Sequence, residues 1–154
     1  MKGIFSALMV PYNEDGSINE KGLREIVRHN IDNMKVDGLY VGGSTGENFM
    51  ISTEEKKRVF EIAIDEAKGQ VQLIAQVGSI NVFESVELGK YATELGYKCL
   101  SAVTPFYYKF SFEEIKEYYF TIVRETGNNM IIYSIPFLTG VNMSVAQFGE
   151  LFAN

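Results

Sequence analysis

The chain has 154 residues, of which 46% are hydrophobic and 22% are charged, a composition typical of a folded globular domain. Its formal net charge of -6 argues against a general nucleic-acid binder and against binding to an anionic membrane surface. The single cysteine excludes a disulfide framework, and the apolar N-terminal stretch is too short for a signal peptide or a membrane span. We therefore expect a cytoplasmic protein.

Five short apolar runs alternate with segments of helical period along the chain. We predict strands at 4–10, 38–42, 72–78, 99–104 and 130–135, and helices at 19–34, 52–69, 81–96, 111–127 and 144–154. The apolar runs recur about every 30 residues, which is the length of a βαβ unit. Because the runs are nearly continuously apolar, we expect a parallel sheet whose strands are buried on both faces.

The helical segments carry an apolar face and signals for their ends. The first segment places Leu23 and Met34 among its core-facing residues. The second segment offers Ser52 or Thr53 as its N-cap. Several segments end in glycine, which is favoured just after a helix C-terminus.

Two architectures fit this alternation. One is a five-stranded doubly wound sheet of flavodoxin type, and the other is the first five βα units of a (β/α)8 TIM barrel, an α/β fold. The last helical segment stops without a tail, which favours the barrel. We expect residues 1–154 to form the N-terminal part of one barrel domain with no internal boundary. Such a half-barrel leaves its first and fifth strands as open edges, so alone it is expected to dimerise or aggregate.

In both architectures ligands bind where the strands end. Glycines, hydroxyl side chains and aromatic side chains dominate these positions, which are 11–12, 42–47, 78–79, 104–108 and 133–134. They include no His or Cys and only one carboxylate, Glu47, so we predict no metal site. His29 lies within a helix, which leaves a Ser-His-Asp triad unsupported. Cys99 lies in an apolar run and is predicted to be core packing.

The loop "VGGSTGENF", residues 41–49, joins the second strand to a helix. Its glycines let backbone N–H groups turn toward one point, and Ser44 and Thr45 add hydroxyl donors. Such a loop binds a carboxylate or phosphate oxygen, or is a plain turn whose glycines allow close packing. At the end of the fifth strand, Tyr133 is either a proton donor or relay, or a rim aromatic. The aromatic pair of Tyr107 and Tyr108 either covers a site or contacts a second subunit.

Three motifs together resemble one enzyme family. "GGSTGEN" follows the second strand, "VTPFYYKFSFEE" the fourth and "IIYSIPFLTGVN" the fifth. They resemble the pyruvate-dependent class I aldolases typified by dihydrodipicolinate synthase and N-acetylneuraminate lyase, and the resemblance covers the whole chain. The G-G-S-T-G-E loop, the S-A-V-T-P-F-Y-Y segment and Leu138, where the synthase has an arginine, favour the lyase branch.

The resemblance implies reversible Schiff-base cleavage of N-acetylneuraminate (sialic acid) to N-acetylmannosamine and pyruvate, without a metal or an organic cofactor. It implies a homotetramer built as a dimer of dimers. In the family, the lysine that forms the Schiff base ends the sixth strand, which would lie beyond Asn154 here. We therefore expect the 154-residue chain alone to be inactive.

The resemblance also implies roles for five residues. Ser44, Thr45 and Gly43 would hold the carboxylate of pyruvate, and Ser44 would hydrogen-bond Tyr133. Tyr133 would carry a proton to and from the substrate oxygen. Tyr107 would reach into the site of the neighbouring subunit.

Two alternatives remain at this point. The first keeps the chemistry but changes the acceptor, as in dihydrodipicolinate synthase or another sugar-acid aldolase. The second is a flavodoxin-like module that binds flavin or phosphate through "STGEN", although that loop follows the first strand in flavodoxins and the second strand here.

Overall fold

The fold is one parallel sheet whose strands lie side by side in the order of the sequence. The structure is a computed structural model and describes residues 1–153. All four neighbouring pairs in the sheet are parallel, and the order is β1-β2-β3-β4-β5. The strands are β1 (Phe5–Ala7), β2 (Gly38–Val41), β3 (Gln72–Gln76), β4 (Cys99–Val103) and β5 (Asn129–Tyr133). The predicted parallel sheet of five strands is thus confirmed.

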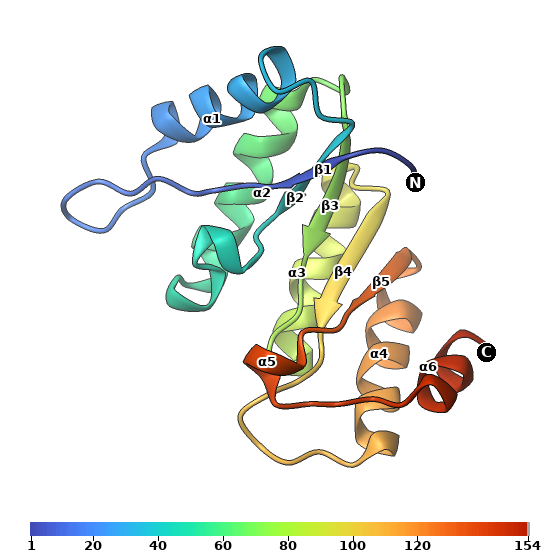
Figure 1. Cartoon of the computed structure of the whole chain (residues 1–154). Coiled ribbons are helices and arrows are strands. Elements are labelled where there is room, and N and C mark those ends of the chain that lie inside the picture. Colours follow the sequence, from blue (N-terminus) through green and yellow to red (C-terminus); the bar gives the residue numbers. More distant parts are fainter. Residues whose placement is uncertain (154) are drawn as a thin grey trace.

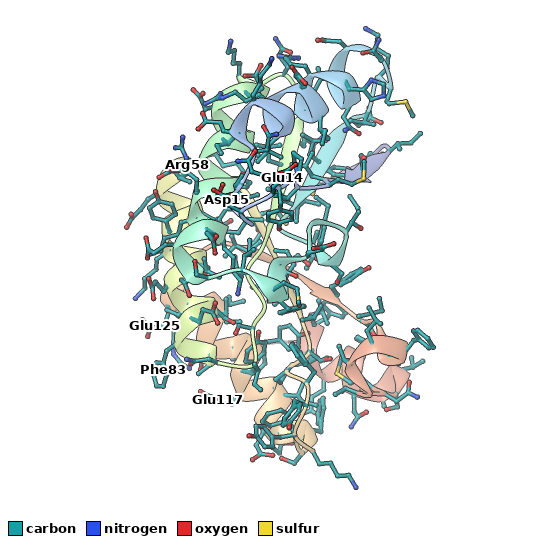
Figure 2. All side chains as sticks on the ribbon, turned by 90° about the vertical axis from the view of Figure 1, so that its left-hand side faces the viewer. Glu14, Asp15, Arg58, Phe83, Glu117 and Glu125 are labelled. Carbon is teal, nitrogen blue, oxygen red and sulfur yellow. The ribbon has the colours of Figure 1, made fainter. Side chains whose placement is uncertain are left out.

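Helices connect consecutive strands and form a layer on one side of the sheet (Figure 1). These are α1 (Glu20–Asp32), α2 (Thr53–Ala67), α3 (Val82–Leu95) and α4 (Phe112–Thr126), followed by α5 (Pro136–Thr139) and α6 (Val145–Phe152). Neighbouring helices of the layer are in contact. Figure 2 shows that Arg58 on α2 and Glu117 and Glu125 on α4 lie on the outer side of this layer, facing solvent.

The hydrophobic core lies between the sheet and the helices. Alternate strand residues, such as Leu39 and Val41 of β2 and Leu100 and Ala102 of β4, are completely buried there against the helices. Residues between them face the opposite side, which we call the inner face. The inner face comprises Tyr40, Ile74, Gln76, Cys99, Ser101, Val103, Ile131 and Tyr133.

Burial on the inner face falls off toward the edges of the sheet, so the expectation of strands buried on both faces holds only at its centre. All five residues of β4 are buried, whereas β5 alternates between exposed and half-buried residues. β1 and β5 each pair with one strand only, and both are edges as expected. On the inner face of β5, the apolar side chains of Ile131 and Tyr133 are exposed, because no other segment of residues 1–153 covers them.

Two helical details differ from the predictions. Met34 is 62% exposed, because α1 ends at Asp32 and the chain turns before Met34 reaches the buried face. The short helix α5 was not predicted, because one turn has no period to detect. Within residues 1–153, none of the helices has both the length and the apolar character needed to cross a membrane.

Ser52, not Thr53, caps α2. The Ser52 side chain accepts a hydrogen bond from the Glu55 amide, and the Glu55 carboxylate accepts one from the Ser52 amide at 2.8 Å, a complete capping box. Replacing Ser52 by alanine is expected to lower the free energy of unfolding by about 1 kcal/mol, because the Glu55 amide loses the hydroxyl oxygen that accepts its hydrogen bond. Denaturant unfolding of the intact protein measures this; an unchanged midpoint would contradict it.

Candidate active site

The loop after β2 is built for a close turn at the carboxyl edge of the sheet. Gly42 has φ +74°, and a Cβ atom there would lie 2.9 Å from the ring of Phe60. Only glycine fits both conditions without strain. The chain then forms a single turn of 3₁₀ helix, Ser44–Gly46, and a second at Asn48–Met50 before α2 begins. This presents the side chains of Ser44 and Thr45 to solvent.

Two side chains from other strands and loops anchor this turn. Gln76 is 3% exposed, and its Nε2 donates to the carbonyl oxygens of Gly42 at 3.5 Å and Gly78 at 3.3 Å. The Gly78 amide donates to Oε1 of Gln76. The Tyr12 hydroxyl donates to the Gly46 carbonyl at 2.9 Å. Sequence reasoning missed Gln76, although a glutamine inside an apolar run is the signal that could have identified it.

Ser44 is one of the residues that line a cavity of about 320 Å³. Within residues 1–153, the side chains of Ser44 and Thr45 form no hydrogen bond, so both hydroxyl groups are available to a ligand. The cavity is mostly apolar and is lined by Ser44, Glu47, Asn48, Phe49, Met50, Val103, Phe106, Ile135, Leu138 and Thr139. It therefore joins the loop after β2 to the segments that follow β4 and β5.

Tyr133 ends β5 on the inner face and is 37% exposed. Its ring lies 5.5 Å from the ring of Tyr40, measured between centroids. In the described part of the chain its hydroxyl makes no hydrogen bond, and the bond expected between Ser44 and Tyr133 is not formed. Tyr133 therefore shares the carboxyl edge of the sheet with Ser44 without touching it.

Tyr107 stands outside this cavity. Its side chain is 83% exposed, and its ring packs edge-to-face against the ring of Tyr108, with centroids 5.0 Å apart. Its φ of 76° is unfavourable for a residue other than glycine. The loop after β4 thus holds Tyr107 away from its own sheet, in a strained conformation of the kind that clusters at functional sites.

A largely buried ion pair lies next to the loop, between the first turns of α2 and α3. Lys56 of α2 donates to Glu84 of α3 at 2.7 Å, and the two side chains are 7% and 21% exposed. Glu84 also accepts hydrogen bonds from Ser79 at 2.5 Å and Thr53 at 3.0 Å. Burial alone would raise the pKa of Glu84, but the bonds from Lys56 and Ser79 outweigh it and lower that pKa. The pair fastens the start of α2, just after the loop, to the start of α3.

The other titratable candidates lie outside the site. His29 is in the last turn of α1, away from the carboxyl ends of the strands. Cys99 is buried at the start of β4, as predicted, but on the inner face and outside the core between sheet and helices; burial raises the pKa of its thiol. Among residues 1–153, no group of three or more His, Cys, Asp or Glu side chains could hold a metal ion.

Comparison with known proteins places this arrangement in a family. The sequence profile of the Dihydrodipicolinate synthetase family matches residues 1–154. The chain belongs to this family. Its five βα units correspond to the N-terminal half of the family's (β/α)8 barrel, which confirms the predicted barrel and excludes the flavodoxin-like alternative.

The most similar family members include sialic acid lyases. The curated N-acetylneuraminate lyase of Fusobacterium nucleatum is 87% identical over all 154 residues, which cover 53% of its length. The structure of that lyase complexed with pyruvate superposes with a TM-score of 0.93 at 86% identity, covering 100% of this chain and 52% of the other. CdNal from Clostridium difficile, solved in complex with mannosamine, has a TM-score of 0.99 at 70% identity, with 100% and 53% covered. This chain thus spans about half the length of the family members it matches.

Proposed function

We propose that this chain is the first half of an N-acetylneuraminate lyase, which cleaves sialic acid reversibly to N-acetylmannosamine and pyruvate. The 87% identity to the curated lyase of Fusobacterium nucleatum across every βα unit supports this most strongly. In this proposal residues 1–154 belong to one barrel domain with no internal boundary, and the remaining strands complete it.

The carboxylate of the substrate binds to the loop after β2. Ser44 and Thr45 offer two exposed hydroxyl groups in the 3₁₀ turn that follows Gly43. Gln76 and Tyr12 hold the carbonyl oxygens of Gly42 and Gly46, so the loop does not need to reorganise to bind. Fixing the carboxylate presents the neighbouring ketone carbon for attack.

The reaction itself uses a lysine amine from the second half of the barrel. The amine condenses with the ketone of open-chain sialic acid, releasing water and forming an imine. When the carbon–carbon bond breaks, its electron pair moves into the imine to give an enamine. The hydroxyl group on the departing carbon becomes the aldehyde of N-acetylmannosamine and gives up its proton. Tyr133 accepts that proton as it passes its own hydroxyl proton to the exposed Tyr107 of a neighbouring subunit, which in turn releases a proton to solvent. The enamine then takes up a proton at carbon, and water hydrolyses the resulting imine to release pyruvate and the free lysine.

This chemistry needs neither a metal nor an organic cofactor, because the imine itself accepts the electron pair. We propose a cytoplasmic homotetramer, a dimer of dimers in which the strained loop around Tyr107 crosses to a partner subunit. The 154-residue chain alone is expected to cleave no sialic acid, because in this proposal the lysine that forms the Schiff base belongs to the second half of the barrel.

Borohydride trapping tests the proposal. The intact protein that carries this chain is incubated with pyruvate and reduced, and its mass is compared with that of an untreated sample. A stable pyruvate adduct on one lysine is expected, and its absence would rule out the Schiff base. In parallel assays, turnover of aspartate semialdehyde without cleavage of sialic acid would assign the synthase reaction instead.

Replacing Ser44 or Thr45 by alanine tests the carboxylate site separately. Each change removes a hydrogen bond to a charged group and is expected to raise KM for pyruvate in the condensation direction by about tenfold to a hundredfold. Ser52→Ala is the control, since the Ser52 hydroxyl caps α2 and Ser52 is not among the residues that line the cavity. If all three variants share the KM of the parent, the loop does not hold the carboxylate.

A further inference from the structure

Tyr40 lies between the two parts of the candidate active site. It sits in β2 on the inner face, two residues before the loop begins. A Cβ atom on Gly43 would lie 2.7 Å and 2.9 Å from the Cε1 and Cδ1 atoms of Tyr40, so the Tyr40 ring packs directly on the backbone of Gly43. The ring also packs against that of Tyr133, with centroids 5.5 Å apart and planes tilted by 44°. One side chain thus touches both the loop and the proposed proton carrier.

The far end of Tyr40 is fixed as well. Its hydroxyl donates to Oγ of Ser101 in β4 at 3.0 Å. Ser101 is fully buried and donates its own proton to the carbonyl of Ile131 in β5 at 3.2 Å. This chain of hydrogen bonds runs from β2 across the inner face to the strand that carries Tyr133. The ring of Tyr40 is therefore held at its contacts and at its hydroxyl, which leaves it little freedom to move.

Tyr40 does not carry the proton itself. Burial raises the pKa of its hydroxyl above the ordinary value for tyrosine, and the proton is committed to Ser101. The role of Tyr40 therefore depends on its position between Gly43 and Tyr133. Tyrosine is a stiff spacer with few rotatable bonds, and it fills the space that separates Gly43 from the Tyr133 ring.

We propose that Tyr40 is a positioning residue that sets the separation between the Ser44–Thr45 loop and Tyr133. The proposal rests on the function proposed above, because it matters only if the loop and Tyr133 act on one substrate. It also explains why residue 43 is glycine. A side chain at that position would push the Tyr40 ring toward Tyr133 or lift the loop away from it.

The kinetic test compares two substitutions of Tyr40 in the intact protein. Tyr40→Phe keeps the ring between Gly43 and Tyr133 but removes the hydroxyl that bonds Ser101. We therefore expect kcat to fall about threefold to tenfold, with KM for sialic acid unchanged. Tyr40→Leu removes the spacer, and misplacement of this kind is expected to lower kcat on the order of a hundredfold. A graded loss in kcat that leaves KM in place distinguishes positioning of Tyr133 from general damage to the fold.

Tyr97→Phe is the matched control. Tyr97 is equally a buried tyrosine with a bonded hydroxyl, which donates to the Phe60 carbonyl at 2.9 Å, but it lies on the helix side of the sheet. Its kcat is expected to equal that of the parent. The proposal is overturned if Tyr40→Leu keeps the kcat of the parent, or if Tyr97→Phe loses as much as Tyr40→Phe.

A second test does not depend on activity. Gly43→Ala introduces the clash with the Tyr40 ring and is expected to lower Tm in the parent, but much less in a Tyr40→Leu background where the ring is gone. If Gly43→Ala lowers Tm equally in the parent and in the Tyr40→Leu variant, the proposal that Tyr40 acts as a spacer is overturned. If the parent forms no pyruvate adduct, the proposed function fails, while this pair of variants still reports whether Tyr40 spaces the loop.

Discussion

Tyr133→Phe is expected to lower kcat for sialic acid cleavage by about 10²- to 10⁴-fold, the usual contribution of a positioned proton-transfer group. The substitution keeps the ring that packs on Tyr40 and removes only the hydroxyl, so the fold should be unaffected. Since Ser44 and Thr45 would still hold the carboxylate in the proposed function, KM is expected to change little. Steady-state kinetics on the intact protein measure both constants.

Tyr91→Phe provides the control for this experiment. Tyr91 also has a bonded hydroxyl, which donates to Glu61, but it lies on the outer helix layer between α3 and α2. It should keep the kcat of the parent. A Tyr133→Phe enzyme that also keeps this kcat would show that another group transfers the proton.

Lys56→Met is expected to give the largest loss of stability, about 3 kcal/mol in the free energy of unfolding at neutral pH. It leaves the carboxylate of Glu84 partly buried with hydrogen bonds from Ser79 and Thr53 but no positive charge. The adjacent Lys57→Met is the control. Lys57 bonds Glu54 and Glu87, both exposed partners at the surface, so its loss is expected to cost less than about 1 kcal/mol.

The pH dependence of this loss gives a second check. The folded pKa of Glu84 is depressed, so the stability it contributes is present above its unfolded pKa of about 4.3 and is lost as the pH falls through the lower folded pKa. In Lys56→Met, burial of Glu84 without a neighbouring positive charge favours the protonated carboxyl. The gap between parent and variant should therefore be smaller at acidic than at neutral pH, as measured by urea unfolding. Equal costs for Lys56→Met and Lys57→Met at every pH would contradict the structure.

The repeating elements were predictable because their signals are local. Each long helix combines an apolar stripe with caps a few residues away, such as the Ser111–Glu114 capping box and the glycine that ends α3. The predicted bounds therefore lie within a few residues of those observed. Single turns such as α5, and the two 3₁₀ turns after β2, have no period and were missed.

The residue pairs that hold the candidate site in place were not predictable, because the two members of each pair are far apart in the sequence. Lys56 and Glu84 are 28 residues apart, Gln76 and Gly42 are 34 apart, and Tyr40 and Ser101 are 61 apart. Composition and spacing do not identify such partners. The loop residues Ser44 and Thr45 were proposed from the sequence because a glycine-rich turn between strand and helix is itself a local signal.

The strand order has a consequence for how the protein is made. Each strand from β2 to β5 pairs with the strand synthesised just before it, so none of these four pairings waits for a segment that emerges later from the ribosome. Contacts of such short sequence separation form quickly. The sheet can grow unit by unit at the pace of translation, with the newest strand always at the growing edge.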